Sequence, residues 1–260
     1  VKRWKSLQSN IIKFKALVLL ISVGIYIDDK KYLIPYCSVA LDKEINNTFD
    51  SGGGIYSRDP NILSQIFSLL TWAEILLKKI EFELTESHKL IILKVAPILR
   101  SLRHSDGSLL GFRGKTEYPT KHLDRALINS GVKHSLPKRE AMGYARLGRK
   151  NVSIFVDTGG QFDSVTEGNF LDTKSAIEIT INKCPFIISG AKATDMAGKP
   201  RGNVNKIHNS SALKLGNELA NVVNLQPANL EWIESKTDTI LKTSHSGYLL
   251  ETGLTQTRML

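Results

Sequence analysis

The stretch PILRSLRHSDGSLLGFRG (residues 97–114) divides the sequence into a first part with helical periodicity and a second part with strand periodicity. It is apolar toward both ends and polar in the middle, where residues 103–107 are RHSDG. A buried helix that ends in this pentapeptide brings Arg103, His104 and Asp106 to one loop. Gly107 allows the left-handed backbone that helix ends and tight turns often need. We therefore expect this loop to lie where a helical domain meets a β domain, a common place for ligand sites.

Four apolar patterns before this loop have the spacing of helices. Asp59 and Pro60 suit the N-cap and first position of one helix, whose apolar stripe continues to Ile80. Pro97 lies inside the last helix and should bend it, because it removes one backbone hydrogen bond. The predicted helices cover residues 4–23, a segment from near Pro35 to residue 45, residues 60–80 and residues 85–103. Helices joined by short loops pack as antiparallel hairpins.

After a polar and basic segment, the pattern changes to the period of strands. Ile177, Ile179 and Ile181 alternate with small or polar residues, which predicts a solvent-exposed position for Glu178. Residues 152–156 and 212–215 have strand-like patterns followed by turn-forming residues. Many short strands separated by turns are typical of a sandwich. We predict a helical domain over 1–112, a basic connector over 113–140 and an antiparallel β-sandwich over 141–260.

The composition is that of a folded protein with a basic surface. The 260 residues are 42% hydrophobic and 23% charged, and the formal net charge is +10. This charge favours an anionic partner, and nucleic acid, acidic polysaccharide and anionic membrane all fit. The longest apolar run, residues 16–27, is too short to span a bilayer, so we predict no transmembrane segment.

The two cysteines and the chain ends give further expectations. Cys37 and Cys184 fall in different predicted domains, so we expect no disulfide and two buried thiols. The chain begins with Val1 and ends within what resembles a strand, from which we expect a fragment of a longer protein. The sequence carries no signal for an oligomeric state.

Two loops contain candidate ligand-binding groups. The glycine triplet at 52–54 precedes a helix and could cradle a phosphate, could be a flexible loop, or could face a glycan whose carboxylate Arg58 binds with two hydrogen bonds. In the 103–107 loop, His104 could titrate near neutral pH or could simply cap a helix C-terminus. The six histidines form no local pair with zinc-ligand spacing.

Several segments together resemble the heparinase II/III-like family, in the version common in alphaproteobacteria. They occur in the family's order and cover nearly the whole chain: residues 49–60 (FDSGGGIYSRDP), 96–114, 143–159, 176–178 (AIE), 207–210 (IHNS) and 245–248 (HSGY). The resemblance implies a partial α/α toroid of helical hairpins followed by an antiparallel β-sandwich, with a glycan cleft between them. On this basis the chain starts inside the toroid and stops inside the sandwich.

The resemblance also implies an activity, a carbon–oxygen lyase that cleaves a uronate-containing acidic polysaccharide by β-elimination, and a location in the bacterial cell envelope or periplasm. If the activity is retained, we expect Tyr144 or His104 to transfer the proton and Arg58 and Arg103 to bind the carboxylate, with Asp106 as a further substrate-binding residue. The resemblance implies a divalent metal such as zinc, and His208 matches a metal-ligand histidine of the better-studied lyases. Where those lyases carry a His-x-His pair, this sequence has Asn169 and Leu171.

Two other functions remain open from the sequence. A non-catalytic glycan-binding or scaffold protein of the cell envelope would keep the fold without the chemistry, and the replaced His-x-His pair favours it. A nucleic-acid-binding protein is disfavoured, because the basic residues are dispersed and neither a recognition helix nor an aromatic-rich strand motif is evident.

Overall fold

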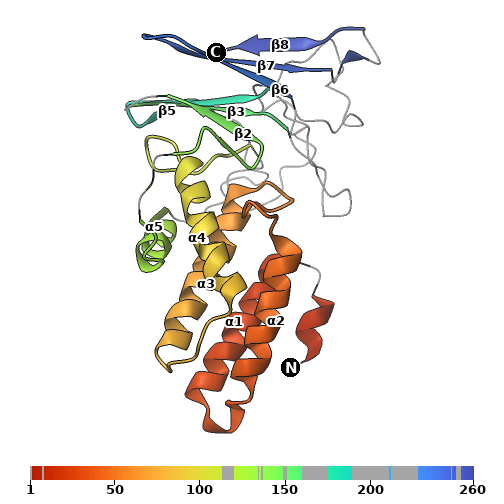
Figure 1. Ribbon diagram of the computed structural model, residues 1–260, viewed down its shortest axis with the longest axis vertical. Coiled ribbons are helices and arrows are strands. Elements are labelled where there is room, and N and C mark those ends of the chain that lie inside the picture. Colours follow the sequence, from red (N-terminus) through yellow and green to blue (C-terminus); the bar gives the residue numbers. More distant parts are fainter. Residues whose placement is uncertain are drawn as a thin grey trace, which may run out of the picture. The chain divides into compact units, whose positions relative to one another are not determined.

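The computed structural model describes residues 2–7, 9–112, 120–133, 135, 137–148, 151–159, 175–188, 211, 228–246, 248–249 and 253–260 (Figure 1). The chain divides into two compact units. The helical unit comprises Val1–Tyr56, Pro60–Arg100 and Tyr118–Pro137. The β unit comprises Ser57–Asp59, Ser101–Glu117 and Lys138–Leu260. The two short insertions into the β unit carry Arg58 and His104.

The helical unit is built from α-helices that pack against one another. Helix α1 contacts both α2 and α3, and α3 contacts α5 (Figure 1). The elements are η1 (Lys2–Ser6), α1 (Asn10–Tyr26), η2 (Asp28–Lys30), α2 (Leu33–Thr48), α3 (Pro60–Lys78), α4 (Glu86–Ser101) and α5 (Thr120–Asn129). The four predicted helices are therefore confirmed. The segment predicted as a connector contains α5, which buries Leu123, Ala126 and Leu127.

Helix α3 is the apolar centre of this unit. It begins at Pro60, as its sequence predicts, because the proline ring suits the first turn of a helix. Among the described residues it is the helix with the length and composition to cross a membrane, but 61% of its apolar window is buried inside the structure. Burial of that kind is expected of a core helix, so α3 is weak evidence for a membrane span.

The β unit contains two antiparallel sheets. The five-stranded sheet has the order β1 (Glu140–Ala141), β2 (Tyr144–Leu147), β3 (Val152–Asp157), β4 (Ile177–Ile181) and β5 (Cys184–Ile187). The three-stranded sheet has the order β6 (Asn229–Glu234), β7 (Thr239–His245) and β8 (Gln256–Met259). Asn182 and Lys183 join β4 to β5 with φ values of 50° and 66°, as a tight two-residue hairpin turn requires.

The five-stranded sheet has two different faces. Its apolar face, formed by Ala145, Leu147, Ile154, Val156 and Ile177, packs against side chains of the second sheet around Leu241. Its polar face carries the residues of the opposite alternation: Tyr144, Arg146, Ser153, Phe155, Asp157, Glu178 and Thr180. The apolar cluster between the sheets confirms the predicted β-sandwich.

Several expectations from the sequence can be compared with the structure of the two units. Glu178 is buried, with 3% of its surface exposed, so its predicted solvent-exposed position is wrong. Both faces of this sheet are covered, and the period of two alone could not reveal that. Cys37 is buried and burial raises the pKa of its thiol to about 11, whereas Cys184 is exposed on β5, contrary to expectation. Both thiols are free, as predicted. The strand predicted at 212–215 lies outside the described residues.

Candidate functional site

The polar face of the five-stranded sheet brings together three of the predicted site residues: Arg58, His104 and Tyr144. Strand register places Tyr144 opposite Asp157 and Phe155 opposite Glu178, so these side chains share one face. The insertions 57–59 and 101–117 supply Arg58 and His104 to the same unit. Residues more than 80 positions apart in the sequence are thereby joined.

The Arg58 side chain is held in place by hydrogen bonds to other groups of the protein. Its Nε donates to the carbonyl of Met142 at 2.8 Å, and one terminal nitrogen donates to the carbonyl of Gly143 and to Asp157 Oδ1. Asp157 Oδ1 also accepts the Gly159 amide at 2.9 Å. Arg58 and Asp157 are both more than 90% buried. The carboxylate bound by Arg58 is thus the protein's own, which gives this predicted substrate-binding residue a structural partner.

Tyr144 lies against the same arginine. Its hydroxyl donates to the Arg58 carbonyl at 2.8 Å, and the Arg58 guanidinium carbon is 4.5 Å from the centre of the tyrosine ring. The Phe112 ring stacks on Tyr144, with centroids 5.5 Å apart and planes 8° apart. Only 1% of Tyr144 is exposed. Cation–π contact, stacking and the hydrogen bond together fix this side chain.

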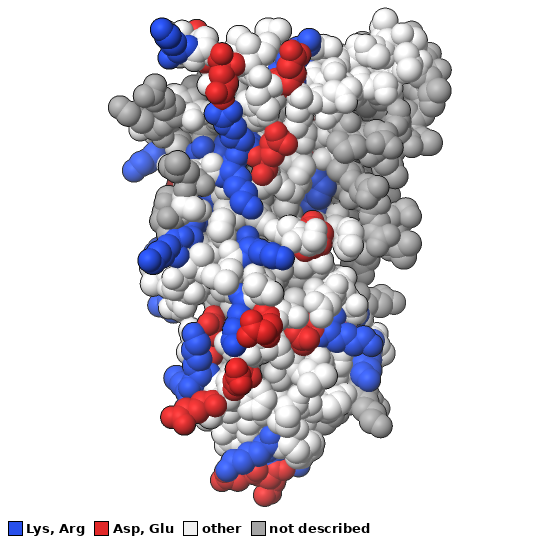
Figure 2. Space-filling model, in the orientation of Figure 1, with Lys and Arg blue, Asp and Glu red and all other residues white. Residues whose placement is uncertain are grey.

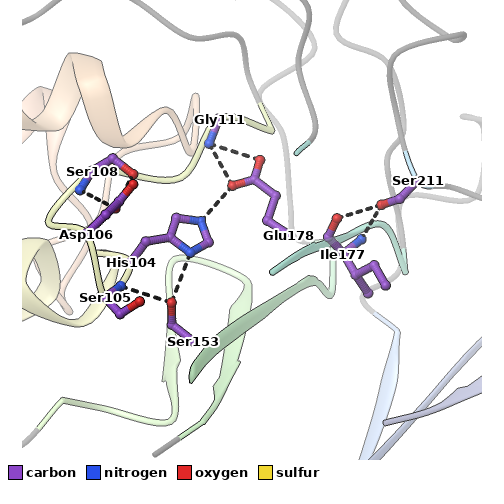
Figure 3. A network of polar contacts seen from close by, with 9 residues as sticks. All are labelled: His104, Ser105, Asp106, Ser108, Gly111, Ser153, Ile177, Glu178 and Ser211. Carbon is purple, nitrogen blue, oxygen red and sulfur yellow. Dashed lines mark hydrogen bonds and ion pairs between the residues drawn. The ribbon is translucent and has the colours of Figure 1, made fainter. Parts of the chain in front are cut away.

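A second buried network surrounds His104 (Figure 3). Its Nδ1 lies 3.1 Å from Ser153 Oγ, and its Nε2 lies 2.9 Å from Glu178 Oε2. Glu178 also accepts the Gly111 amide, at 3.1 and 3.2 Å for its two oxygens. The imidazole meets Phe155 edge to face, with centroids 4.8 Å apart. We name His104, Ser153, Glu178 and Gly111 the histidine network.

Ser153, His104 and Glu178 contact one another in the order of a hydrolase triad. Their geometry, however, does not permit that chemistry. Ser153 is fully buried, and its Oγ already accepts the Ser105 amide at 3.0 Å. A serine nucleophile needs an exposed Oγ with a site for the reacting carbonyl nearby. The histidine network therefore has the form of a structural anchor.

The remaining predicted site residues of this loop lie in a tight turn. The His104 amide donates to the Ser108 carbonyl at 2.8 Å, and the Gly107 amide donates to the His104 carbonyl at 2.9 Å. Arg103 Nε donates to the Gly107 carbonyl, and Asp106 Oδ1 accepts from Ser108. Gly107 has φ 87°, as expected for the left-handed position of the turn. Asp106 is exposed and Arg103 partly exposed, so both remain within reach of a ligand.

The glycine triplet belongs to the helical unit and does not form a phosphate cradle. Asp50 Oδ1 accepts the amides of Gly52 and Gly54, and the Asp50 carbonyl accepts the Gly53 amide. Because these donors are engaged within the loop, none is free to bind an anion. The triplet is therefore a self-contained turn that closes on an aspartate.

The described residues do not fit a metal site. Among them, no group of three or more His, Cys, Asp or Glu side chains could hold a metal ion. His208 lies outside the described residues, as do Asn169 and Leu171.

Sequence reasoning missed the partners that define this site. The sequence patterns place Ser153 within a strand, Asp157 among the turn-forming residues that follow it, and Glu178 at the surface. The one available signal was the pair of charged residues, Asp157 and Glu178, at the end and middle of otherwise apolar strands. A charged residue in such a position is buried only with a partner.

A hollow also occurs in the helical unit. It has a volume of about 610 Å³ and is lined mainly by apolar atoms of η1 and α2, including Trp4, Tyr36 and Val39. None of the predicted site residues lines it. On the face drawn in Figure 2, Lys and Arg groups lie among Asp and Glu groups.

The described α-helices are followed by two packed antiparallel sheets, and the structures that the chain resembles combine an α/α toroid with a β-sandwich, so the predicted fold class is confirmed. The chain is similar over 97% of its length to a structure described as heparinase III with methylated lysines (TM-score 0.70, 12% identity). It is also similar over 98% of its length to heparan sulfate lyase HepC from Pedobacter heparinus (TM-score 0.65, 14% identity). A crystal structure of heparinase III has a TM-score of 0.66 over 96% of the chain, at 12% identity.

These similarities have a defined extent. The chain spans 43% to 44% of the length of the three proteins that it resembles. No protein-family model matches the sequence, and no curated protein matches it. The likeness is therefore one of fold, in which the sequence retains few identical residues.

Proposed function

We propose that this protein is a carbon–oxygen lyase that cleaves an acidic, uronate-containing polysaccharide by β-elimination. The observation that carries the proposal is the similarity of fold to heparinase III and to heparan sulfate lyase HepC over nearly the whole chain. The net charge of +10 supports an anionic substrate. The two similar structures are named for their action on heparin and heparan sulfate. That this protein acts on a polysaccharide of the same acidic kind is part of the proposal.

The chemistry places three demands on the protein. A base removes the proton on the carbon next to the uronate carboxylate, and an acid protonates the departing glycosidic oxygen. A cation or hydrogen-bond donor must also stabilise the charge that develops on the carboxylate. Arg103 and Asp106 are the predicted substrate-binding residues that remain exposed or partly exposed, and Arg103 supplies the cation.

Tyr144 and His104 remain the predicted groups for proton transfer, but the structure sets a condition on that role. Tyr144 is 1% exposed and His104 is 8% exposed, and both have protein hydrogen-bond partners. Both side chains are covered by protein in this structure, so a direct role in proton transfer requires the packing around them to open. Arg58 would help only indirectly, since its guanidinium pairs with Asp157.

Incubation of the protein with heparin, heparan sulfate and polygalacturonate tests the proposal. β-Elimination leaves a carbon–carbon double bond conjugated to the carboxylate, so we expect ultraviolet absorbance to rise together with a fall in polymer length. Neutral dextran is the control substrate. The variant Arg103→Ala should lose most of the rate, whereas Lys242→Ala, which removes an exposed cation on β7, should not. Shortened polymers without the unsaturated end would contradict a lyase.

A catalytically inactive glycan-binding protein of the cell envelope is the second candidate. The burial of Tyr144 and His104 among protein partners favours it, as does the replacement of the family's His-x-His pair by Asn169 and Leu171. It predicts saturable heparin binding, measured by calorimetry, without any product. Fractionation of source cells would test the proposed location in the envelope or periplasm.

A further inference from the structure

The proton positions of the histidine network follow from its donors and acceptors (Figure 3). Ser153 Oγ accepts the Ser105 amide, which leaves its own proton for an acceptor. Glu178, when ionised, can only accept, so His104 Nε2 must carry a proton to hydrogen-bond with it. In the neutral imidazole, Nδ1 is then the acceptor for the Ser153 hydroxyl. One tautomer therefore satisfies every member of the network.

This arrangement occupies both ring nitrogens of His104. Nε2 bears a proton shared with Glu178, and Nδ1 faces Ser153, so neither nitrogen has a free position for a substrate atom. The imidazole also meets the Phe155 ring edge to face, and 8% of His104 is exposed. A general base must come within hydrogen-bond distance of the proton that it removes. In this geometry His104 cannot be that base.

The histidine network holds the turn that carries Arg103 and Asp106, the exposed or partly exposed candidates for substrate binding. The His104 backbone makes two of the turn's hydrogen bonds, to Ser108 and from Gly107. Its side chain ties the same turn to strands β3 and β4 through Ser153 and Glu178. Gly111, at the far side of the turn, is bound to the same carboxylate. A single buried carboxylate thus fixes both sides of the loop.

We propose that Glu178 and Ser153, acting through His104, are positioning residues that set the geometry in which Arg103 and Asp106 are presented to a uronate group. This inference rests on the proposed lyase function for its substrate, and it replaces proton transfer as the role of His104. Because the turn is internally hydrogen-bonded, loss of its anchor should displace it as a unit and weaken substrate binding. The chemical step itself should change little.

The kinetic test compares Glu178→Gln with the matched surface variant Glu231→Gln on the proposed polysaccharide substrate. Glutamine keeps one acceptor but turns its amide toward another donor, so about one charge-assisted hydrogen bond is lost. We expect KM to rise about tenfold with kcat within about threefold, and no change for Glu231→Gln. His104→Gln, which removes the imidazole that joins Ser153 to Glu178, should behave in the same way. A catalytic His104 would instead lose about 100-fold or more in kcat, which would overturn the proposal.

A double-mutant cycle shows whether Glu178 acts through His104. The KM effects of Glu178→Gln and His104→Gln should be strongly non-additive, because both variants break the same link. Additive effects would contradict the proposed chain of contacts. Thermal unfolding shows whether each variant is folded and so reveals a general loss of structure. If Glu178→Gln does not fold, the kinetic test uses His104→Gln.

Amide hydrogen exchange tests the anchor without any substrate and separates this inference from the proposed function. In Glu178→Gln we expect faster exchange at His104, Gly107 and Gly111, with unchanged exchange in β7. Unchanged protection at these three amides would overturn the positioning role even in an active lyase. Conversely, faster exchange in a protein that cleaves no polysaccharide would retain the anchor and reject the lyase.

Discussion

The two faces of the five-stranded sheet are made from the same strands, yet they are stabilised by different interactions. The apolar face packs Ala145, Leu147 and Val156 around Leu241 of the second sheet. The polar face, one residue out of phase, buries Asp157 and Glu178 with Arg58 and His104 as partners. One face tolerates changes that conserve volume, whereas the other depends on complete pairs.

This difference predicts which substitutions should lower the free energy of unfolding most. Removing a methyl group from the apolar face leaves a cavity whose cost depends on how far neighbours relax. Removing one partner from the polar face leaves a charge without compensation in a region that excludes water. The largest effects should therefore fall on the polar face, although its residues contribute less apolar area.

The largest effect is expected for Asp157→Ala. The substitution leaves the buried Arg58 guanidinium without its carboxylate and the Gly159 amide without its acceptor. We expect a loss of about 3–5 kcal/mol in the free energy of unfolding, measured by chemical denaturation. Glu231→Ala, which removes an exposed carboxylate from β6, is the control and should lie within about 0.5 kcal/mol of the original protein. Equal stability of the two variants would mean that the Arg58–Asp157 pair does not stabilise the fold.

On the apolar face, Leu241→Ala should cost somewhat less. Leu241 is fully buried between the sheets, and its truncation combines lost apolar burial with a cavity. We expect a loss of about 2–4 kcal/mol, read from the same denaturation curves. Leu249→Ala provides the comparison, since 47% of Leu249 is exposed. If Leu241→Ala proves more costly than Asp157→Ala, the contrast between the two faces is reversed.

In the helical unit, a buried histidine should make the stability of the protein depend on pH, with a smaller effect than the substitutions above. His88 is buried, its Nε2 lies 3.0 Å from the Leu70 carbonyl, and burial lowers the pKa of its imidazole below the ordinary value of 6.5. The unfolded chain thus binds this proton more readily than the folded one. Stability from this group is complete above pH 6.5 and falls as the pH drops below that value toward the folded-state pKa.

Urea denaturation from pH 7.5 to pH 5 tests this linkage. His88→Gln should be less stable than the original protein at the upper pH but should lose less stability on acidification. His122→Gln, which removes an exposed histidine from α5, is the control and should retain the original pH dependence. A parallel decline of all three proteins would show that other groups cause the acid sensitivity.

The smallest effect is expected for an exposed ion pair of the β unit. Lys242 and Glu231 face each other directly across β6 and β7, with 3.1 Å between their charged atoms. Their side chains are 41% and 58% exposed, so solvent screens the attraction. Lys242→Ala should therefore change the free energy of unfolding by less than about 0.5 kcal/mol. A loss comparable to that of Asp157→Ala would remove the distinction between buried and exposed pairs.

Much of the fold could be predicted from local patterns. Asp59 and Pro60 marked the start of α3, and apolar spacing located the other long helices within a few residues. The alternation at 177–181 located β4. These signals are local, because capping, proline geometry and side-chain periodicity act over one or two turns of chain.

The candidate site could be predicted only in part. Arg58, His104 and Tyr144 were selected, and they do lie in one unit with shared contacts or a shared sheet face. Their partners were not selected, because Glu178 was expected at the surface and Asp157 in a turn. A sequence shows which residues share a strand face but does not show what covers that face.

The sequence by itself determined the order of helices and strands, the position of the tight turn at Gly107 and the excess of positive charge. Only the tertiary structure decided that Arg58 pairs with Asp157, 99 residues away, and that His104 pairs with Glu178, 74 residues away. The physical reason is that burial selects these partners: a charged group enters a covered sheet face only where a distant segment supplies its complement.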